Sequence, residues 1–568
     1  MKVVIVGGVA GGASAAARIR RLDESAEIKI FERTGYVSYA NCGLPYFIGG
    51  EIENREDLTL QTPKSFKERF NIDVFVNHEV IKINKDKKTV IVKDLTKDYV
   101  FEELYDKLLL APGAHPILPE VVGVGSKRIF TLRTVEDTFE IFDYIKSQKV
   151  KTATVVGGGF IGLEMVENLI NQKIKVNLVQ KGDHVLNPVD FDMASLLHAE
   201  LRKNGVNLLL NKNVVEFKET KSGIIAVFEE GEEIESQIII LAIGVLPETS
   251  LAKDAGLELG EKGSIVVNER METSEKDIFA VGDAVSIKHL VTGTRAVISL
   301  AGPANKQGRI VADNICGRNS KFVGGLGTSV LKLFSLTTGM VGLNESLLKR
   351  AGVNYEKVVL SPANHATYYP GAQAMTMKVI FDPKTEKIFG AQIVGYAGVD
   401  KRIDVIATAM FNKMKASDLK DLDLAYAPPY SSAKDPVNMA GFMIDNIVTG
   451  TVNQFYYEDL ENIKKDKNVF LLDTRTINEF NRGHADGFVN IPVDSLRKEL
   501  SKLDKNKKIY VMCQSGLRSY IATRILMQNG FDAYNFAGGF RYYQIVHDEK
   551  CVSSKIMPCG MEIKNAKN

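Results

Sequence analysis

The sequence has few cysteines, no excess of one charge and no long hydrophobic run. Lys and Arg number 72 against 70 Asp and Glu in 568 residues, which leaves a formal net charge of +2. A chain this balanced lacks the basic field that nucleic-acid binding usually needs. The apolar run at residues 238–245 is far shorter than the roughly 20 residues that cross a bilayer. We therefore expect neither nucleic acid nor a membrane as a partner.

The N-terminus and the cysteines favour a reducing compartment. The apolar run at residues 3–6 leads directly into glycines, without the longer apolar segment and cleavage site of a signal peptide. Only 5 cysteines are spread over the chain, which does not suggest a disulfide-stapled secreted protein. The 8 histidines do not cluster as metal ligands, so we expect no metal. We predict a cytoplasmic protein whose thiols are available for chemistry.

A strand, a glycine turn and a helix open the chain. The β-branched run at residues 2–6 precedes Gly-Gly-Val-Ala-Gly-Gly at residues 7–12, and a second apolar run ends at Glu32. In such a unit the glycines let the backbone approach a pyrophosphate, while the helix N-terminus presents free N–H groups to it. An acid that ends the second strand accepts hydrogen bonds from ribose. The pattern predicts a dinucleotide site with Gly7, Gly12 and Glu32.

The same pattern occurs a second time. Residues 152–156 precede Gly-Gly-Gly-Phe-Ile-Gly at residues 157–162, and the following run ends at Gln180. We therefore predict a second dinucleotide site at Gly157, Gly159 and Gly162. Gln180 replaces the acid usual for NADH, and the next residue, Lys181, could instead pair with a 2′-phosphate. The choice between NADH and NADPH stays open at this point.

Two further segments resemble the flavoprotein disulfide reductases that contain two dinucleotide folds. Residues 277–284, Asp-Ile-Phe-Ala-Val-Gly-Asp-Ala, resemble the family's second flavin motif, in which the residue matching Asp283 binds the ribityl chain of FAD. Residues 108–114, Leu-Leu-Leu-Ala-Pro-Gly-Ala, resemble the crossover between its two nucleotide domains. The resemblance implies FAD and NADH or NADPH as cofactors, with the NAD domain inserted in the FAD domain. We also expect Arg33 and Ala284 to contact FAD.

Cys42 is the most informative thiol. It lies in Ser-Tyr-Ala-Asn-Cys-Gly-Leu-Pro-Tyr at residues 38–46, and residues 43–72 contain no second cysteine. A solitary thiol beside a flavin can cycle as a mixed disulfide with a substrate or as a sulfenic acid. Pro45 is compatible with the first turn of a helix, whose N-terminal positive charge would lower the thiol pKa.

The segment around Cys42 closely resembles the active site of coenzyme A disulfide reductases, and the resemblance covers roughly residues 1–450. NADH peroxidases and NADH oxidases resemble the same scaffold, but their first glycine loop normally carries a histidine where this chain has Ala10. We therefore favour the mixed disulfide over the sulfenic acid.

The resemblance to coenzyme A disulfide reductases also implies substrate contacts. Arg18 and Arg21 are three residues apart, hence on one helix face, and suit the pyrophosphate of coenzyme A; a solvated helix face is the alternative interpretation. Tyr368 and Tyr426 match family tyrosines that reach the partner subunit's active site, where a phenol can donate a proton to a departing thiolate. The remaining substrate-binding residues implied by the resemblance are Ser14, Ser38, Asn41 and Lys434.

A new domain begins beyond about residue 453. The strand-like run at residues 508–512 leads into Cys-Gln-Ser-Gly-Leu-Arg-Ser at residues 513–519, which resembles the active-site loop of rhodanese sulfurtransferases. Loop N–H groups around the Cys513 sulfur, together with Arg518, would stabilise a thiolate or a persulfide. We expect Cys513 to carry a sulfane sulfur; the alternative is a rhodanese fold used only for regulation or docking. Cys316 is expected to be a packed helix-end thiol, and Cys551 and Cys559 lie in the tail.

The predicted fold class is α/β, with two Rossmann-like dinucleotide-binding domains, an α+β dimerisation domain and a C-terminal α/β rhodanese domain. The expected bounds are residues 1–118 and 245–322 for FAD, 119–244 for NAD(P)H, 323–450 for dimerisation, 455–548 for the rhodanese-like domain and 549–568 for the tail.

These features predict a homodimeric, FAD-dependent NAD(P)H reductase of coenzyme A disulfide, coenzyme A persulfide or polysulfide. Cys42 would cycle as a mixed disulfide with coenzyme A, and Cys513 would deliver sulfane sulfur. Two alternative enzymes are an NADH oxidase or peroxidase that uses a Cys42 sulfenic acid, and a sulfurtransferase whose flavin part reloads Cys513. A non-enzymatic redox sensor is a third hypothesis, which the two intact nucleotide motifs and Arg518 disfavour.

Overall fold

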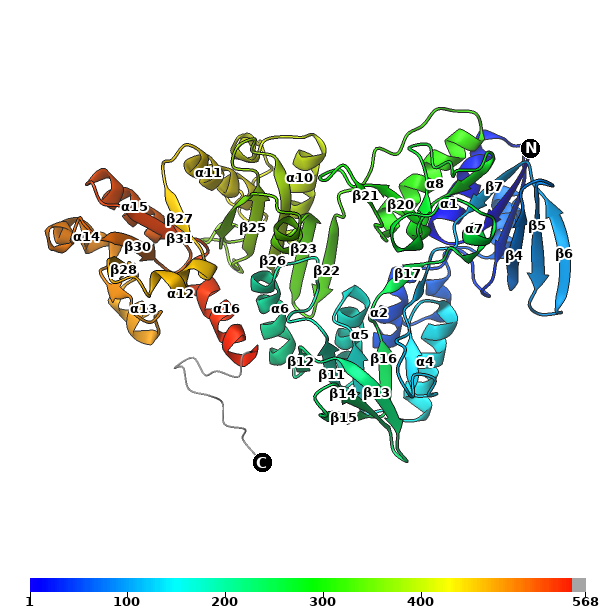
Figure 1. Cartoon of the computed structure of the whole chain (residues 1–568), viewed down its shortest axis with the longest axis horizontal. Helices are drawn as coiled ribbons and strands as arrows, with labels where there is room; N and C mark the ends of the chain where they lie inside the picture. Colours follow the sequence, from blue (N-terminus) through cyan, green and yellow to red (C-terminus); the bar gives the residue numbers. More distant parts are fainter. Residues whose placement is uncertain (554–568) are drawn as a thin grey trace. The chain divides into compact units, whose positions relative to one another are not determined.

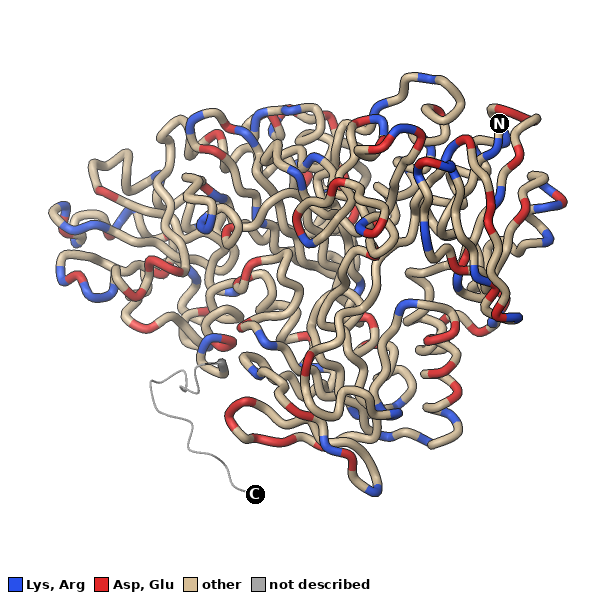
Figure 2. The backbone as a smooth tube through the Cα atoms, turned by 45° about the vertical axis from the view of Figure 1, so that its right-hand side comes forward, with Lys and Arg blue, Asp and Glu red and all other residues tan. Residues whose placement is uncertain are grey.

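A computed structural model describes residues 1–553 (Figure 1). The chain divides into two compact units: Met1–Val185 with Gly205–Gly327, and Leu186–Asn204 with the chain from Thr328 onward. Acidic and basic residues are interspersed along both (Figure 2). Within the described residues, no helix combines the length and the apolar character needed to span a bilayer.

Five parallel strands form the first sheet, in the order β19-β7-β1-β2-β3. Its central strand is almost wholly buried, as expected for a parallel sheet covered on both faces. Helices α1 (Ala10–Leu22) and α8 (Ala301–Ile315) pack together, and a Cβ at Gly308 of α8 would lie 2.6 Å from the Gly11 carbonyl oxygen of α1. The strands are β1 (Lys2–Val6), β2 (Glu27–Glu32), β3 (Asp73–Val76), β7 (Lys107–Leu110) and β19 (Ile278–Ala280).

The second sheet repeats this arrangement in the order β12-β11-β10-β16-β9, again all parallel. In each sheet a glycine turn follows the central strand and leads into a helix, so the two Rossmann-like units predicted from the sequence are confirmed. Helices α4 (Val135–Ser147) and α5 (Phe160–Asn171) belong to the second Rossmann-like domain, which is part of the first compact unit. Its strands are β9 (Ile129–Thr131), β10 (Thr152–Val156), β11 (Lys175–Gln180), β12 (Asn207–Leu210) and β16 (Ile238–Leu241).

Smaller elements complete the first compact unit. Strands β8 (Ala114–Pro116) and β17 (Val245–Pro247) pair antiparallel, so the chain enters and leaves the second Rossmann-like domain side by side, as an inserted domain requires. Two antiparallel three-stranded sheets are formed by β4 (His78–Asn84), β5 (Thr89–Asp94) and β6 (Tyr99–Leu104), and by β13 (Val214–Glu219), β14 (Ile224–Phe228) and β15 (Glu233–Ser236). The remaining helices and strands are α2 (Leu44–Gly49), α3 (Pro63–Phe70), α7 (Ser250–Asp254), β18 (Ile265–Val266), β20 (Val285–Lys288) and β21 (Arg295–Ala296).

In the second unit, an antiparallel sheet in the order β22-β23-β26-β25-β24 packs against α10 (Val399–Phe411). Strands β25 and β26 are buried along their whole length. Mixed strands and helices were expected in this region. The strands are β22 (Ser329–Leu333), β23 (Leu336–Gly342), β24 (Glu356–Leu360), β25 (Thr376–Phe381) and β26 (Ile388–Gly395), and the other helices are α9 (Glu345–Arg350) and α11 (Pro436–Val448).

The C-terminal part is a parallel sheet in the order β27-β31-β30-β28-β29 with helices around it. Helix α16 (Gly539–Ser553) continues past residue 548, where we expected the rhodanese-like domain to end. Cys559 lies outside the described residues. The elements are β27 (Asn453–Phe455), β28 (Val469–Asp473), β29 (Val489–Asn490), β30 (Lys508–Met512), β31 (Ala533–Phe536), α12 (Leu460–Ile463), α13 (Ile477–Arg482), α14 (Val493–Glu499) and α15 (Leu517–Gln528).

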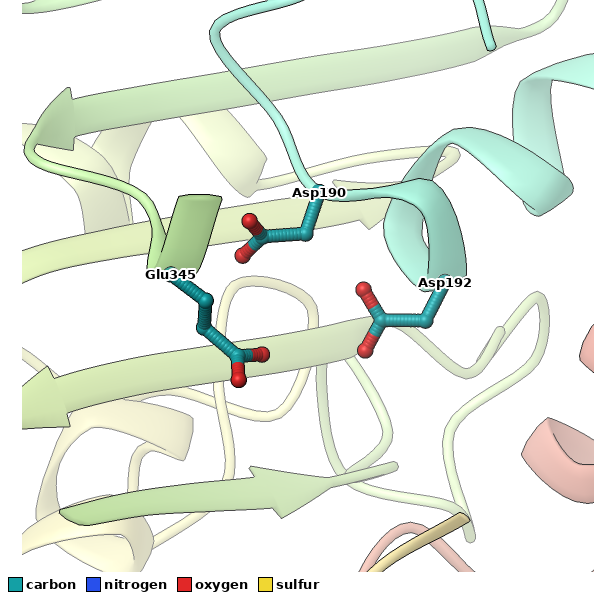
Figure 3. A group of neighbouring side chains, drawn as sticks. All are labelled: Asp190, Asp192 and Glu345. Atoms are coloured by element: carbon teal, nitrogen blue, oxygen red, sulfur yellow. The ribbon is translucent and has the colours of Figure 1, made fainter. Parts of the chain in front are cut away.

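A buried ammonium group joins distant segments of the second unit. The side chain of Lys378, on β25, is fully buried, and its Nζ lies 3.2 Å from Asp190, 2.6 Å from Asp192 and 2.6 Å from Glu345. Asp190 and Asp192 begin α6 (Phe191–Lys203), which lies beside α16 (Figure 1). Figure 3 shows the three carboxylates pointing toward one another. Two buried ammonium groups compensate them. Lys378 contacts all three carboxylates, whose charges outweigh the effect of burial and raise its pKa well above the ordinary value, and Lys357 Nζ lies 2.8 Å from Glu345.

We expect Lys378→Met to lower the free energy of unfolding of this unit by about 3–5 kcal/mol, because Asp190 and Asp192 would lose the buried cation that contacts them and Glu345 would keep only Lys357. Urea denaturation followed by circular dichroism measures the change. The matched control is Lys349→Met: Lys349 is 3.8 Å from the same Glu345, but its side chain is 61% exposed, so the loss should stay below about 1 kcal/mol. Equal, small losses in both variants would contradict this account of the cluster.

Candidate active site

The two predicted glycine turns have the same close contacts. Gly7 has a φ of +93°, and a Cβ there would lie 2.1 Å from the carbonyl oxygen of Ala111. Gly157 has a φ of +108°, and a Cβ there would lie 2.3 Å from the carbonyl oxygen of Ala242. Only glycine fits these positions without strain. Each turn therefore places bare backbone before a helix N-terminus, the arrangement that receives a pyrophosphate.

A cavity follows the first turn and reaches the end of β2. Buried Glu32 accepts a hydrogen bond from the Gly8 N–H at 2.9 Å and another from the Thr34 N–H at 3.0 Å, which fixes its carboxylate. The cavity offers glycine backbone, a carboxylate and an arginine, and these fit the pyrophosphate and ribose of a dinucleotide such as FAD. Residues lining it include Val6, Gly7, Val9, Glu32, Arg33, Ala111, Gly113 and Arg133.

The second flavin motif is linked to this cavity by Arg133, which lines the cavity and contacts Asp283 of the motif. Asp283 is half-buried, and one of its carboxylate oxygens lies 3.6 Å from the Arg133 guanidinium, which lines the cavity. Burial raises the pKa of Asp283, against the effect of Arg133. Ala284 is fully buried beneath the turn and does not line the cavity.

Cys42 lies in a short 3-10 helix, Asn41–Gly43, directly before α2. Pro45 occupies the first turn of α2, as predicted. Helix α2 packs tightly on α5: a Cβ at Gly49 would lie 1.8 Å from the side chain of Asn168, and the Gln172 amide donates to the Gly49 carbonyl at 2.8 Å. The helix that directly follows the Cys42 segment is therefore fixed against α5, the helix that starts at the second glycine turn. Cys42 is exposed and is not in a disulfide.

The surroundings of Cys42 raise the pKa of its thiol, so the prediction of a lowered pKa is wrong for the charges that the chain itself supplies. Although the residue is exposed, the atoms packed around its sulfur desolvate the thiolate, and the charges of Glu164 and Asp283 oppose it; Arg133 acts in the other direction. The partial positive charge at the N-terminus of the six-residue helix α2 does not outweigh this desolvation and these two carboxylates. Burial, followed by the charge of Glu167, in turn raises the pKa of Glu164 to about 7.

A separate pocket collects four of the predicted substrate residues: Ser14, Arg18, Arg21 and Ser38. Ser38 has a φ of +48°, which is unusual for a residue other than glycine, and its N–H donates to the Gly8 carbonyl at 2.8 Å. Arg18 pairs with Asp313 at 2.9 Å, while Arg21 is exposed. Asn41 is next to Cys42 and does not line this pocket. The sequence analysis missed two polar lining residues, Gln61 and Arg309, which carry no motif of their own.

The two predicted tyrosines meet in the second unit. The hydroxyls of Tyr368 and Tyr426 lie 2.7 Å apart, and the residues are 74% and 46% exposed. Arg402, which the sequence analysis missed, is buried and binds Asp435 at 2.9 Å, and it also donates to the carbonyls of Asn364 and Tyr430. This one side chain therefore joins the two loops near the tyrosines. Lys434 is exposed beside Asp435.

Cys513 lies at the end of β30, where the chain turns into α15. Its side chain is fully buried, and its sulfur accepts hydrogen bonds from the Gly516 N–H and the Ser519 hydroxyl, both at 3.2 Å. Gly516 has a φ of +99°, which turns its N–H toward the sulfur. The Phe540 N–H donates to the Cys513 carbonyl at 2.7 Å. The loop thus supplies the donors that stabilise a sulfur anion.

The charge of Arg518 is shared with Glu479. Its guanidinium makes two hydrogen bonds of 2.7 Å to that carboxylate, and the pairing lowers the pKa of Glu479 to about 2. Glu479 is itself held by Thr476 at the start of α13. Arg475, fully buried, makes a second ion pair with Asp473 at 2.7 Å. Arg518 is thus oriented by a carboxylate, which the sequence analysis did not anticipate.

The other described cysteines lie on helices. Cys316 follows the last residue of α8 and packs against the hydrophobic core around the first parallel sheet, which confirms the prediction of a packed helix-end thiol. Cys551 lies buried in the last turn of α16, and its sulfur is 3.7 Å from His547 Nε2.

Three families match the chain in succession. Residues 1–308 match the pyridine nucleotide-disulphide oxidoreductase family, residues 328–436 match the dimerisation domain of the same family, and residues 457–545 match the rhodanese-like domain.

Individual relatives agree with this order. The coenzyme A disulfide reductase of Staphylococcus haemolyticus (strain JCSC1435) is 38% identical over 442 residues, which is 78% of this chain and 98% of that protein. The crystal structure of reduced Bacillus anthracis CoADR-RHD is 48% identical, has a TM-score of 0.94, and covers 96% of this chain and 98% of its own. The NAD-dependent persulfide reductase from A. fulgidus is 35% identical with a TM-score of 0.90, over 95% and 100% of the two chains.

These matches confirm the predicted fold class and the resemblance to coenzyme A disulfide reductases with a C-terminal rhodanese domain. The family implies FAD and a nicotinamide nucleotide, and the two glycine turns fit both. The chain therefore belongs to the pyridine nucleotide-disulphide oxidoreductase family of flavoprotein enzymes and carries its dimerisation domain and a rhodanese-like domain.

Proposed function

We propose that the protein is an NAD(P)H-dependent reductase of coenzyme A disulfide, coenzyme A persulfide or polysulfide, in which Cys42 cycles as a mixed disulfide with coenzyme A. One observation carries the proposal: Ser14, Arg18, Arg21 and Ser38 line one pocket, and Ser38 belongs to the same segment as the solitary thiol Cys42. A cationic pocket near an unpaired thiol suits a polyanionic thiol such as coenzyme A.

The proposed cycle needs only one protein sulfur at this site. When bound, FAD would accept a hydride from the nicotinamide nucleotide and supply two electrons to the Cys42 disulfide. The S–S bond between Cys42 and coenzyme A breaks, which leaves the Cys42 thiolate and a coenzyme A thiolate that takes up a proton. The Cys42 thiolate then attacks coenzyme A disulfide, forms a new mixed disulfide and expels the second coenzyme A as a thiolate. With coenzyme A persulfide, attack on the inner sulfur expels hydrosulfide instead.

Other residues of the chain would bind the substrate and supply protons. Arg21 and Arg309 are exposed cations at the pocket and suit the phosphates of coenzyme A. We propose that the protein is a homodimer in which Tyr368 and Tyr426 serve the partner's active site, as their exposure allows. In the 2.7 Å pair one hydroxyl donates to the other, so the second keeps its proton for a departing thiolate. Lys434 would bind phosphate from the same loop region.

Cys513 would feed this reaction with sulfur. A Cys513 persulfide transfers its outer sulfur to the thiolate of coenzyme A; a new S–S bond forms, the Cys513 S–S bond breaks, and the Cys513 thiolate leaves. The N–H of Gly516 and the hydroxyl of Ser519 support that leaving thiolate. The product, coenzyme A persulfide, is the substrate that Cys42 reduces.

An NADH oxidase or peroxidase is the alternative function, and Ala10 bears on it. Ala10 is the first residue of α1 and offers no acid–base group next to the glycine turn. A side chain that assists oxygen chemistry is therefore lacking at that position.

We expect Cys42→Ser to lower the rate of NAD(P)H-dependent reduction of coenzyme A disulfide and coenzyme A persulfide by about 10³-fold or more, because a hydroxyl cannot form the mixed disulfide. Steady-state oxidation of NAD(P)H by the flavin-loaded protein measures the rates. Thiosulfate:cyanide sulfur transfer should survive in this variant and disappear in Cys513→Ser.

The matched control is Cys316→Ser, which removes a half-buried thiol that belongs to neither proposed sulfur site and should keep both activities. Mass spectrometry of the purified wild-type protein should find a coenzyme A adduct on the Cys42 peptide. Fast turnover with oxygen alone, with no turnover of the sulfur substrates, would refute the proposal.

We expect Glu164→Gln to lower the pH at which the Cys42 thiol ionises, because a nearby negative charge that raises its pKa is removed. The pH dependence of iodoacetamide alkylation of the Cys42 peptide, in the reduced holoenzyme, measures the midpoint. The wild-type midpoint should lie above that of an ordinary thiol. Glu140→Gln, an exposed residue of α4, is the control and should leave the midpoint in place. A midpoint unchanged in Glu164→Gln would show that its charge does not act on Cys42.

A further inference from the structure

The strand that follows each glycine turn ends in a side chain with the same structural task. In the first Rossmann-like domain, the Glu32 carboxylate accepts a hydrogen bond from the N–H of Gly8 at 2.9 Å. In the second Rossmann-like domain, the side-chain carbonyl of Gln180 accepts a hydrogen bond from the N–H of Gly158, also at 2.9 Å. The two domains thus share one geometry but differ in chemistry: the acceptor is a carboxylate in the first and a neutral amide in the second.

The hydrogen bond to Gly158 fixes the orientation of the Gln180 amide. A backbone N–H needs an acceptor, so the amide oxygen faces the glycine turn and the NH₂ group faces away. Consistent with this, a Cβ at Gly182 would lie 3.3 Å from the Gln180 nitrogen. Toward a nucleotide the side chain therefore offers donors only. Ribose hydroxyls lose the acceptor that a carboxylate provides, whereas a phosphate, which accepts hydrogen bonds, gains a donor.

Lys181 adds a positive charge to the same loop. It is exposed, and no ion pair of Lys181 occurs among the described residues. Among the neighbouring charged groups, Asp183 contacts the His184 ring at 2.6 Å. Lys212, which follows the end of β12 and whose N–H bonds the Gln180 carbonyl, pairs with Glu230 and Glu232 at 3.5 and 2.7 Å. Lys181 is therefore the cation next to Gln180 that forms no ion pair within the described part of the chain, and no carboxylate stands in the place of Glu32.

We propose that the second nucleotide site selects the 2′-phosphorylated nucleotide NADPH over NADH, with Gln180 and Lys181 as its specificity-determining residues. The inference rests on the proposed function and names the reductant of that reaction. The Gln180 NH₂ group donates to the 2′-phosphate, and the Lys181 ammonium compensates its charge.

Binding of the oxidised nucleotides tests the proposal without any turnover. Isothermal titration calorimetry of the FAD-loaded full-length protein should give a dissociation constant for NADP⁺ about tenfold or more below that for NAD⁺. Gln180→Glu should reverse the preference, because the carboxylate accepts from ribose and repels the phosphate. Lys181→Ala should weaken NADP⁺ by about fivefold or more and leave NAD⁺ unchanged. Steady-state kcat/KM for NADPH and NADH should follow the same order.

Lys175→Ala is the matched control, since it removes an equally exposed charge at the opposite end of β11 and should leave both constants unchanged. Tighter binding of NAD⁺ to the wild type, or a preference unaffected by both Gln180→Glu and Lys181→Ala, would overturn the inference. Cys42→Ser should bind both nucleotides as the wild type does. If the wild-type protein showed this preference but none of the sulfur activities, the result would therefore count against the proposed function alone.

Discussion

A buried ammonium group in contact with three carboxylates constrains the architecture of the second unit. Lys378 is surrounded by carboxylates from α6 and α9, and the Tyr542 hydroxyl of α16 donates to one of them, Asp192. A buried charge is tolerated only when it is fully paired, so neither the ammonium nor a carboxylate can be lost without a large cost. A strand of the dimerisation sheet, helix α16 of the rhodanese-like domain and α6 are thereby held together.

What could be predicted from the sequence was local. The glycine turns, the Cys42 segment and the Cys513 loop each occupy fewer than ten consecutive residues, and their chemistry follows from residue types at short spacing. What could not be predicted depends on side chains that meet only in the fold. Lys378 and Asp190 are 188 residues apart, and Arg402 and Asp435 are 33 apart. No periodicity or motif marks such partners, because the packing of helix ends against other helices and strands brings them together.

The Cys42 pKa illustrates how a correct local observation can lead to a wrong electrostatic conclusion. The helix with Pro45 in its first turn is present, but it is short, and packing of α2 on α5 brings in the carboxylate of Glu164. A thiol with a raised pKa is ionised less often, yet its thiolate is the stronger nucleophile. Such a thiol would suit repeated attack on a substrate disulfide in the proposed cycle, and its ionisation would depend on the charge of Glu164, a half-buried acid of α5.

The two proposed sulfur sites differ in what can reach them. Cys42 is exposed, and Ser38 of the same segment lines the pocket that contains Arg21 and Arg309. Cys513 is fully buried under its loop. A bulky thiol cannot bond to that sulfur directly, but a persulfide extends about 2 Å further, one S–S bond length. In the proposed cycle the rhodanese-like site would therefore give away one sulfur atom rather than hold a mixed disulfide. Coenzyme A would link the two sites, because it would take that atom from the Cys513 persulfide and present it to Cys42.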